Sequence, residues 1–382
     1  MNFELSREEA MVKDAIRDWV SKECPRDLVA QLDEADEFPS KLLSKLAKLG
    51  FSGMTVPEAY GGEGRNILGT CLVIEQIANL YPALARCYGA KTILGGALID
   101  ALGSDEQKAI YLPQCAKGKL LVAFAHGEKT NTNQPLKLRE NGKGSPGYVL
   151  NGEKHYVSNA DQAQLLLVSA CVDDNDSNQG EKSAFLLLDP HLEGITIEPV
   201  AKIGYKGAQS CRVHFDHVTP DKNALLGGER AESNTSLGPQ IMDFFLLSVS
   251  AEAVGLAQGV FDYTLKHARQ RVQFGQAIGK FPAIRRRFAE MACQIDAARL
   301  LLYRACWLAD RGKSFHREAS MAKFTAGETA YRCAMDGLQI YGGYGYTMEY
   351  DIQRYIRDAV CLAPADTEQS AIATRIGHGM GL

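Results

Sequence analysis

The sequence has no long apolar run and no excess of charge of one sign, and each absence removes a class of protein. No uninterrupted apolar stretch reaches the ~18 residues that a bilayer-crossing helix needs. Lys and Arg number 42 against 46 Asp and Glu, a net charge of −4, so nothing indicates the basic surface that nucleic acids or anionic membranes attract. The first residues lack the basic and apolar segments of a signal peptide. We therefore expect a cytoplasmic protein that binds neither nucleic acid nor membrane.

Disulfide and metal motifs are also missing. Ten cysteines are present, but no pair has the Cys-x-x-Cys spacing and most lie in apolar or helical stretches. This pattern predicts reduced thiols that pack as small hydrophobic residues. Histidines such as His126 and His155 have no cysteine partners at ligand spacing, so we expect no metal site.

The 382 residues do contain three successive patterns of hydrophobicity. Apolar residues recur three and four apart up to about Leu120, which predicts an N-terminal α-helical domain over residues 1–120. The period then shortens, which predicts a middle β-barrel-like domain over 121–230. The helical period returns from Pro239 and predicts a C-terminal helical bundle over 231–382. The expected fold class is α+β.

Local patterns within these domains are specific enough to test. Asn151-Gly152 lies between two strand-like segments and predicts a tight hairpin, because both turn positions need positive φ. The polar stretch 173–181 predicts a loop between strands. A long apolar seam predicts one bundle helix; its residues are Phe281, Ile284, Phe288, Met291, Ile295, Ala298, Leu302 and Ala305.

Several short motifs, taken together and in order, identify a family. They are Val56-Pro57-Glu58 with Tyr60-Gly61-Gly62, the 154–160 segment, Gly255-Leu256-Ala257-Gln258, Arg271 to Gly275, Gln339 to Tyr346 and Arg357-Asp358-Ala359. In this order they resemble the acyl-CoA dehydrogenase family over essentially the whole chain. The resemblance implies that family's fold: an N-terminal helical domain, a middle β domain and a C-terminal four-helix bundle.

Two of these motifs carry residues suited to a dinucleotide. The planar, charged fork of Arg271 suits a pyrophosphate, although an isolated Arg also suits a surface salt bridge. Gly342 and Gly343 allow a ligand to approach the backbone closely, although they also suit an interhelical turn. The resemblance implies that Arg271, Phe274, Gln339 and Gly343, beside Gly342, bind the dinucleotide half of FAD across a subunit interface, and that the protein is a homotetramer.

The resemblance also implies a flavin-ring site in the β domain. There Tyr156 would pack behind the isoalloxazine and Ser158 would touch its N5 edge. The family's first flavin loop, roughly Thr-Glu-Pro-x-Ala-Gly-Ser-Asp, corresponds here to a segment that begins at Phe124 and runs to Gln134, in which only Glu128 matches. Gly127 offers its backbone but no hydroxyl.

Substrate contacts depart from the family pattern as well. The Arg that commonly holds the CoA arm is replaced by Leu246, and Phe245 occupies the position of an alternative catalytic Glu. For the base that removes the α proton, counting forward from Ala359 selects Asp366, whereas counting back from Arg375 selects Glu368. Asp366 also suits a helix cap.

The expected function is FAD-dependent oxidation of the α,β bond of an acyl thioester, with hydride transfer to flavin N5. The acyl group would be carried by CoA or by an acyl carrier protein. Electrons would pass to an external acceptor such as an electron-transfer flavoprotein. The alternative is a member that keeps the fold and the flavin site but has lost or changed the dehydrogenation, such as a non-redox lyase or a binding or partner subunit.

Overall fold

The computed structural model describes residues 4–128, 136–140, 147–172, 183–228, 237–362 and 366–380, without the side chains of residues 140, 222 and 366–369. The N-terminal part is helical, and its elements precede the first strand. They are α1 (Arg7–Glu23), α2 (Arg26–Ala35), α3 (Ser40–Lys48), the 3₁₀ turns η1 (Phe51–Gly53) and η2 (Glu58–Tyr60), α4 (Ile67–Ala78), α5 (Pro82–Gly89), the π-helical η3 (Ala90–Ala97), α6 (Leu98–Leu102) and α7 (Asp105–Ala116).

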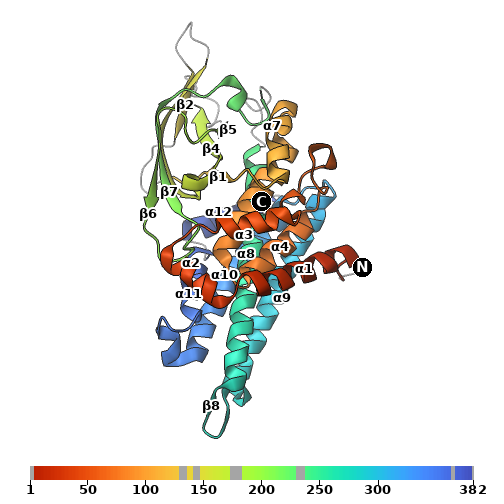
Figure 1. Ribbon diagram of the computed structural model, residues 1–382, viewed down its shortest axis with the longest axis vertical. Helices are drawn as coiled ribbons and strands as arrows, with labels where there is room; N and C mark the ends of the chain where they lie inside the picture. Colours follow the sequence, from red (N-terminus) through yellow and green to blue (C-terminus); the bar gives the residue numbers. More distant parts are fainter. Residues whose placement is uncertain are drawn as a thin grey trace.

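A mixed seven-stranded sheet follows and lies beside the helical body (Figure 1). Its elements are β1 (Val122–Ala125), β2 (Lys137–Glu140), β3 (Tyr148–Ser158), the 3₁₀ turn η4 (Ala160–Gln162), β4 (Leu165–Val172), β5 (Ser183–Leu188), β6 (Ile195–Val200), β7 (Ser210–Val218) and the 3₁₀ turn η5 (Lys222–Ala224). The strand order is β1-β4-β2-β3-β7-β6, with β5 paired to β4. The segment 173–181 lies outside the described residues.

The hairpin predicted at Asn151-Gly152 is wrong. Residues 148–158 form one continuous strand, and the register of β3 against β7 shifts between Leu150 and Gly152. Gly152 has φ of +139°, and the Asn151 side chain accepts a hydrogen bond from the backbone N–H of His217 at 2.8 Å. A β-bulge uses the same residue types as a tight turn, because both need positive φ.

The C-terminal part is a bundle in which α8 (Leu237–Gln270), α9 (Pro282–Asp310), α10 (His316–Tyr341) and α11 (Ile352–Leu362) pack together. A short hairpin of β8 (Val272–Gln273) and β9 (Gln276–Ala277), followed by the 3₁₀ turn η7 (Ile278–Lys280), joins α8 to α9. The 3₁₀ turn η8 (Gly342–Tyr346) follows α10, and α12 (Asp366–His378) follows α11. In the predicted seam Met291, Ile295, Ala298, Leu302 and Ala305 are buried, whereas Phe281, Ile284 and Phe288 are partly buried.

Helix α8 is the centre of the molecule. By length and composition it could cross a membrane, but 83% of its apolar window is buried inside the protein, as in a core helix. It approaches α4 so closely that a Cβ atom on Gly255 would lie 2.2 Å from the carbonyl oxygen of Glu75. The apolar composition of α8 is therefore explained by packing against its neighbours.

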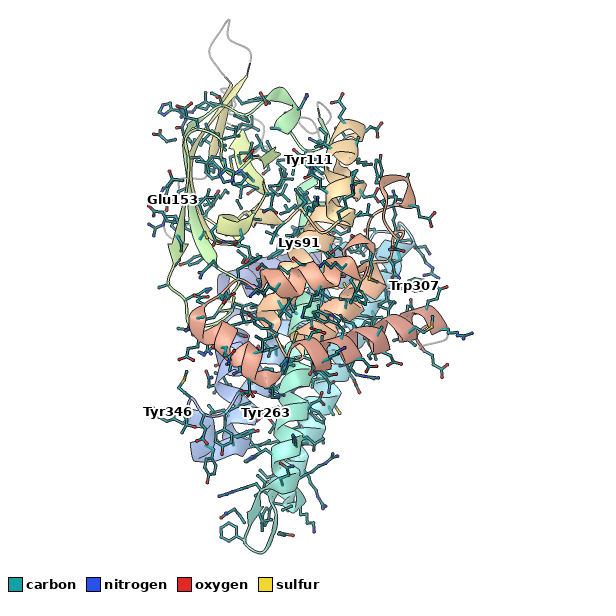
Figure 2. The ribbon with its side chains drawn as sticks, in the orientation of Figure 1. Lys91, Tyr111, Glu153, Tyr263, Trp307 and Tyr346 are labelled. Carbon is teal, nitrogen blue, oxygen red and sulfur yellow. The ribbon has the colours of Figure 1, made fainter. Side chains whose placement is uncertain are left out.

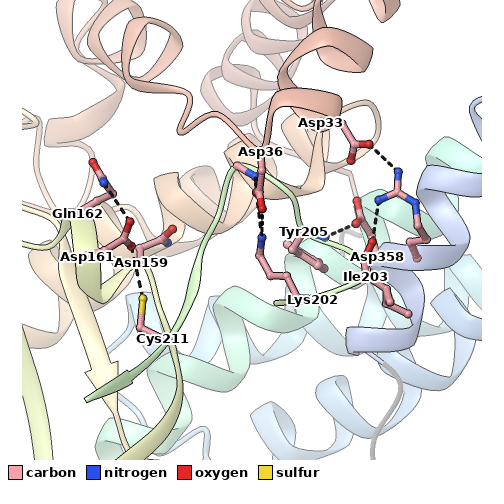
Figure 3. Close-up of polar contacts among 12 residues, drawn as sticks. Asp33, Asp36, Asn159, Asp161, Gln162, Lys202, Ile203, Tyr205, Cys211 and Asp358 are labelled. Carbon is pink, nitrogen blue, oxygen red and sulfur yellow. Dashed lines mark hydrogen bonds and ion pairs between the residues drawn. The ribbon is translucent and has the colours of Figure 1, made fainter. Parts of the chain in front are cut away.

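The segment between β6 and β7 attaches the sheet to the helices (Figure 3). The Asp36 carboxylate accepts hydrogen bonds from Lys202 Nζ at 2.9 Å and from the backbone N–H of Gly207 at 2.6 Å. Asp358 of α11 accepts one from the backbone N–H of Tyr205 at 2.5 Å. Arg357 donates to the carbonyl oxygen of Ile203 at 2.8 Å. These contacts fix the sheet relative to α2 and α11.

Candidate functional site

The structure places the residues predicted for FAD in two separate regions. Phe124, Gly127, Tyr156 and Ser158 belong to the sheet, whereas Arg271, Phe274, Gln339, Gly342 and Gly343 lie on the hairpin after α8 and at the end of α10. Figure 1 shows the β8 hairpin at the far tip of the bundle, away from the sheet. One ligand therefore cannot contact both groups within a single chain.

The hairpin tip presents an aromatic ring to solvent. Phe274 and Gly275 have φ of +50° and +80°, as the two central residues of a type I′ turn require. The Phe274 side chain is 91% exposed, and its ring approaches that of Phe281 edge-on at 6.3 Å between centroids. The turn therefore directs the ring away from its own chain.

The end of α10 forms an open surface next to this hairpin. Helix α10 ends at Tyr341 with Gly342 as its C-cap residue, and a Cβ atom on Gly342 or Gly343 would meet nothing within 4 Å. The Arg271 guanidinium lies 5.0 Å from the centre of the Tyr344 ring, and Tyr346 is 91% exposed (Figure 2). Gln339 is exposed. Among the described residues no carboxylate forms an ion pair with Arg271, so its charge is available to an anion.

The sheet region holds the second group. Tyr156 has φ of +56° and its side chain is 67% exposed, at a place where the register of β3 against β7 shifts between Lys154 and Val157. A tyrosine in the left-handed region is rare and often marks a functional site. The bulge turns this ring outward, and Ser158 follows two residues later on the same strand.

Phe124 connects the sheet to α8. Its ring packs edge-on against Phe245 at 5.5 Å between centroids and stacks on His126 at 5.2 Å. Leu246, which follows Phe245, is buried. The residue in the position of the family's arginine is thus part of the core.

The backbone around position 127 leaves no room for a side chain. The Gly127 carbonyl oxygen accepts a hydrogen bond from the backbone N–H of His155 at 2.9 Å. A Cβ atom at this position would lie 2.7 Å from the carbonyl oxygen of His155. Glycine is therefore needed for the close approach of the segment after β1 to β3.

A polar network centred on the buried Lys154 lies beside this glycine, and the sequence did not predict it. The Lys154 ammonium is 2.8 Å from Glu128 Oε1, 3.2 Å from Ser169 Oγ and 3.3 Å from the carbonyl oxygen of His126. Burial lowers the pKa of Lys154, and the bond to Glu128 opposes that shift. His126 Nδ1 lies 3.1 Å from Ser169 Oγ. The signal in the sequence that could have indicated this network is Lys154, a charged residue at an inward position of a strand.

The candidate bases belong to α12. Asp366 and Glu368 occupy its first turn, and their side chains lie outside the described part of the structure. Arg375 on the same helix donates to Asp243 of α8 at 2.7 Å, and burial raises the pKa of Asp243 to about 7, with Arg375 opposing the shift. Asp243 also lies 3.0 Å from His316 Nδ1. These contacts fix α12 against α8 and α10.

An open cavity of about 490 Å³ adjoins this cluster, and Asp243, His316 and Arg317 are among the residues that line it. Among the residues that the structure describes, no group of three or more potential ligands lies close enough to hold a metal ion. None of the ten cysteines forms a disulfide, and seven of them are buried.

Comparisons with known proteins agree with this arrangement of domains. Three family descriptions match the chain: "Acyl-CoA dehydrogenase, N-terminal domain" over residues 6–119, "middle domain" over 124–218 and "C-terminal domain" over 242–366. The probable acyl-CoA dehydrogenase YngJ of Bacillus subtilis is 34% identical over 94% of each chain. The caffeyl-CoA reductase-Etf complex subunit CarC of Acetobacterium woodii is 31% identical over 92% of this chain and 93% of its own. Butyryl-CoA dehydrogenase from Megasphaera elsdenii superimposes over all of both chains with a TM-score of 0.90 and 27% identity.

Proposed function

The chain belongs to the acyl-CoA dehydrogenase family, whose members are FAD-dependent oxidoreductases of acyl thioesters, and we propose that its FAD site is shared between two copies of the chain. One copy would supply the sheet residues Phe124, Gly127, Tyr156 and Ser158. The other would supply Arg271, Phe274, Gln339, Gly342 and Gly343. The observation that carries this proposal is the exposure of Phe274 at the bundle tip, far from the sheet.

The residues present fit FAD. Arg271 offers two parallel N–H donors to a pyrophosphate, Gly342 and Gly343 leave room for a ligand against the backbone, and the exposed Tyr156 ring offers a flat apolar face. When bound, FAD accepts a hydride from the β carbon of the substrate. Sharing the site between copies makes an oligomer necessary, and we propose a homotetramer.

The carboxylate that removes the α proton is proposed to be Asp366 or Glu368. Both positions lie in the first turn of α12, where the helix dipole favours an ionised carboxylate. A base must be ionised before it accepts a proton. The Arg375–Asp243 ion pair would position the helix that carries this base.

Leu246 bears on how the thioester is held. A buried leucine offers no cation to the phosphate of CoA. Binding of the thioester would therefore depend on other groups. We propose that the substrate is either a CoA thioester or an acyl-carrier-protein thioester. The electron acceptor is proposed to be an electron-transfer flavoprotein, in line with the name of the relative CarC. The proposed compartment is the cytoplasm.

The test begins with the visible spectrum of the purified protein and anaerobic bleaching of its flavin by a panel of acyl-CoA and acyl-carrier-protein thioesters. Asp366→Asn and Glu368→Gln keep the shape of each side chain but remove the base. We expect one of them to retain the flavin and lose substrate-dependent bleaching, because a well-placed general base contributes about 10²–10⁴-fold. A colourless protein, or wild-type flavin that no thioester bleaches, would contradict the proposal. Full bleaching by both variants would remove these two residues as bases.

A further inference from the structure

His126 lies where the sheet meets the helices of the proposed substrate site. Its ring follows β1 and stacks on Phe124 with an interplanar angle of 18°, and Phe124 in turn packs against Phe245 of α8. The cation of Arg375 on α12 is close enough to disfavour a charge on the ring. The imidazole thus lies at the end of β1, separated from α8 by the Phe124 ring and within electrostatic range of α12, the helix that carries the proposed base.

The neighbours of His126 favour one tautomer of its ring. The Lys154 ammonium can only donate, and it does so to Ser169 Oγ at 3.2 Å. The Ser169 hydroxyl hydrogen then has two acceptors within reach, His126 Nδ1 at 3.1 Å and the carbonyl oxygen of Ala125 at 3.5 Å. We assign it to the shorter contact. Nδ1 is therefore an acceptor, and the proton of the neutral ring is on Nε2.

The ring is neutral over the physiological range. Desolvation by the surrounding protein lowers the pKa of His126 to about 4, although the residue as a whole is exposed. The Lys154 cation adds to this shift and Glu128 opposes it. Neutral His126 thus has an Nε2–H donor. Among the described residues no group accepts a hydrogen bond from Nε2.

We propose that His126 donates a hydrogen bond from Nε2–H to an oxygen or nitrogen atom on the acyl chain, and so selects acyl thioesters with a polar substituent. This inference rests on the proposed function of the site. A plain hydrocarbon chain would displace water from Nε2–H without replacing its hydrogen bond, and a site built to bind a polar group discriminates against an analogue that lacks it.

The experiment compares matched pairs of acyl-CoAs on the FAD-loaded protein. Each pair is a straight-chain acyl-CoA and its counterpart with a hydroxyl, oxo or amide group beyond the β carbon, and kcat/KM for flavin reduction is measured for both. His126→Phe keeps an aromatic ring on Phe124 but removes the donor, whereas His126→Gln keeps an N–H donor. His191→Phe, on an exposed turn after β5, is the control.

We expect the wild type to prefer the polar member of at least one pair. His126→Phe should lose that preference by about ten- to a hundredfold, the cost of leaving one acceptor unpaired, while His126→Gln retains part of it. Equal selectivity in the wild type and His126→Phe would overturn the proposed role of His126 and leave the proposed function of the site intact. Wild-type flavin that no acyl thioester reduces would overturn the proposed function together with this inference.

A second measurement does not depend on turnover. Nitrogen-15 shifts of labelled histidine should show His126 as the neutral Nε2–H tautomer between pH 5.5 and 8. Ser169→Ala removes the hydroxyl that fixes Nδ1 and should produce a mixture of tautomers. A charged ring, or a proton on Nδ1 in the wild type, would contradict the assignment.

Discussion

The substitution Phe274→Ala should weaken FAD binding between two copies of the chain without changing the folding stability of either copy. The ring is 91% exposed and approaches Phe281 edge-on, so its removal should change the free energy of unfolding of a chain by less than about 0.5 kcal/mol. Both residues adopt the positive φ at position 274 at similar cost, because both carry a Cβ atom. Any large effect must therefore come from contacts made outside the chain.

If the ring packs against FAD on another copy, its burial stabilises the complex by about 1.5–3 kcal/mol. Since 1.4 kcal/mol corresponds to a factor of ten, the dissociation constant of FAD should rise roughly ten- to a hundredfold. Flavin fluorescence quenching during titration of the apoprotein measures this constant. Ile110→Ala is the matched control, because Ile110 is also an exposed apolar residue, on α7. An FAD affinity equal to that of the control would refute the reasoning.

Mixed oligomers test the shared site directly. Chains of Phe274→Ala retain an intact sheet, and chains of Tyr156→Ala retain an intact hairpin tip. If each site combines the sheet of one chain with the tip of another, re-associated mixtures should recover tight FAD binding in a fraction of the sites. Recovery would be absent if both regions of a site came from the same chain.

Two further predictions concern buried charges. Arg86 Nη2 lies 3.1 Å from Glu252 Oε2, and the side chains are 15% and 2% exposed. Arg86→Met should lower the free energy of unfolding in urea by about 3–5 kcal/mol, because the buried Glu252 carboxylate loses its ion-pair partner and keeps only hydrogen-bond support such as that from Tyr205. The double variant Arg86→Met/Glu252→Gln should recover much of this loss, and no recovery would contradict the account. Burial raises the pKa of Asp358 from its ordinary value near 3.8 to about 6, so the folded state holds its proton more tightly and the stability contributed by this group falls as pH rises from about 4 to 6. Asp358→Asn should therefore gain in Tm relative to wild type across that window, and a constant difference in Tm from pH 4 to pH 7 would show that the group does not titrate there.

The family and the fold could be predicted from the sequence because they depend on patterns with many residues. The two changes of hydrophobic period and the ordered motifs each involve dozens of positions, and the expected family and fold are confirmed by the matched family descriptions and the superposition on butyryl-CoA dehydrogenase. The seam from Met291 to Ala305 was predictable for the same reason, since one buried face repeats with the helical period. Errors arose where few residues decided the outcome.

Asn151-Gly152 is such a case. Positive φ was predicted, and Gly152 adopts it, but a dipeptide alone does not distinguish a turn from a bulge. The pairing of β3 with β7 along its whole length settled this point. The surroundings of helix α8 are a second point that the structure decided, because its composition suits a membrane as well as a core. Only its neighbours α4, α9 and α10 show what covers it.

The sequence alone determined which chemical groups are present: the carboxylates Asp366 and Glu368, the aromatic ring of Phe274, and the imidazole of His126. The tertiary structure decided which of these groups meet. It separated the two predicted FAD regions within one chain, and it placed Ser169 and Lys154 beside His126 from strands β4 and β3. Proximity between residues far apart in the chain depends on strand register and helix packing, and no local pattern in the sequence encodes those distances.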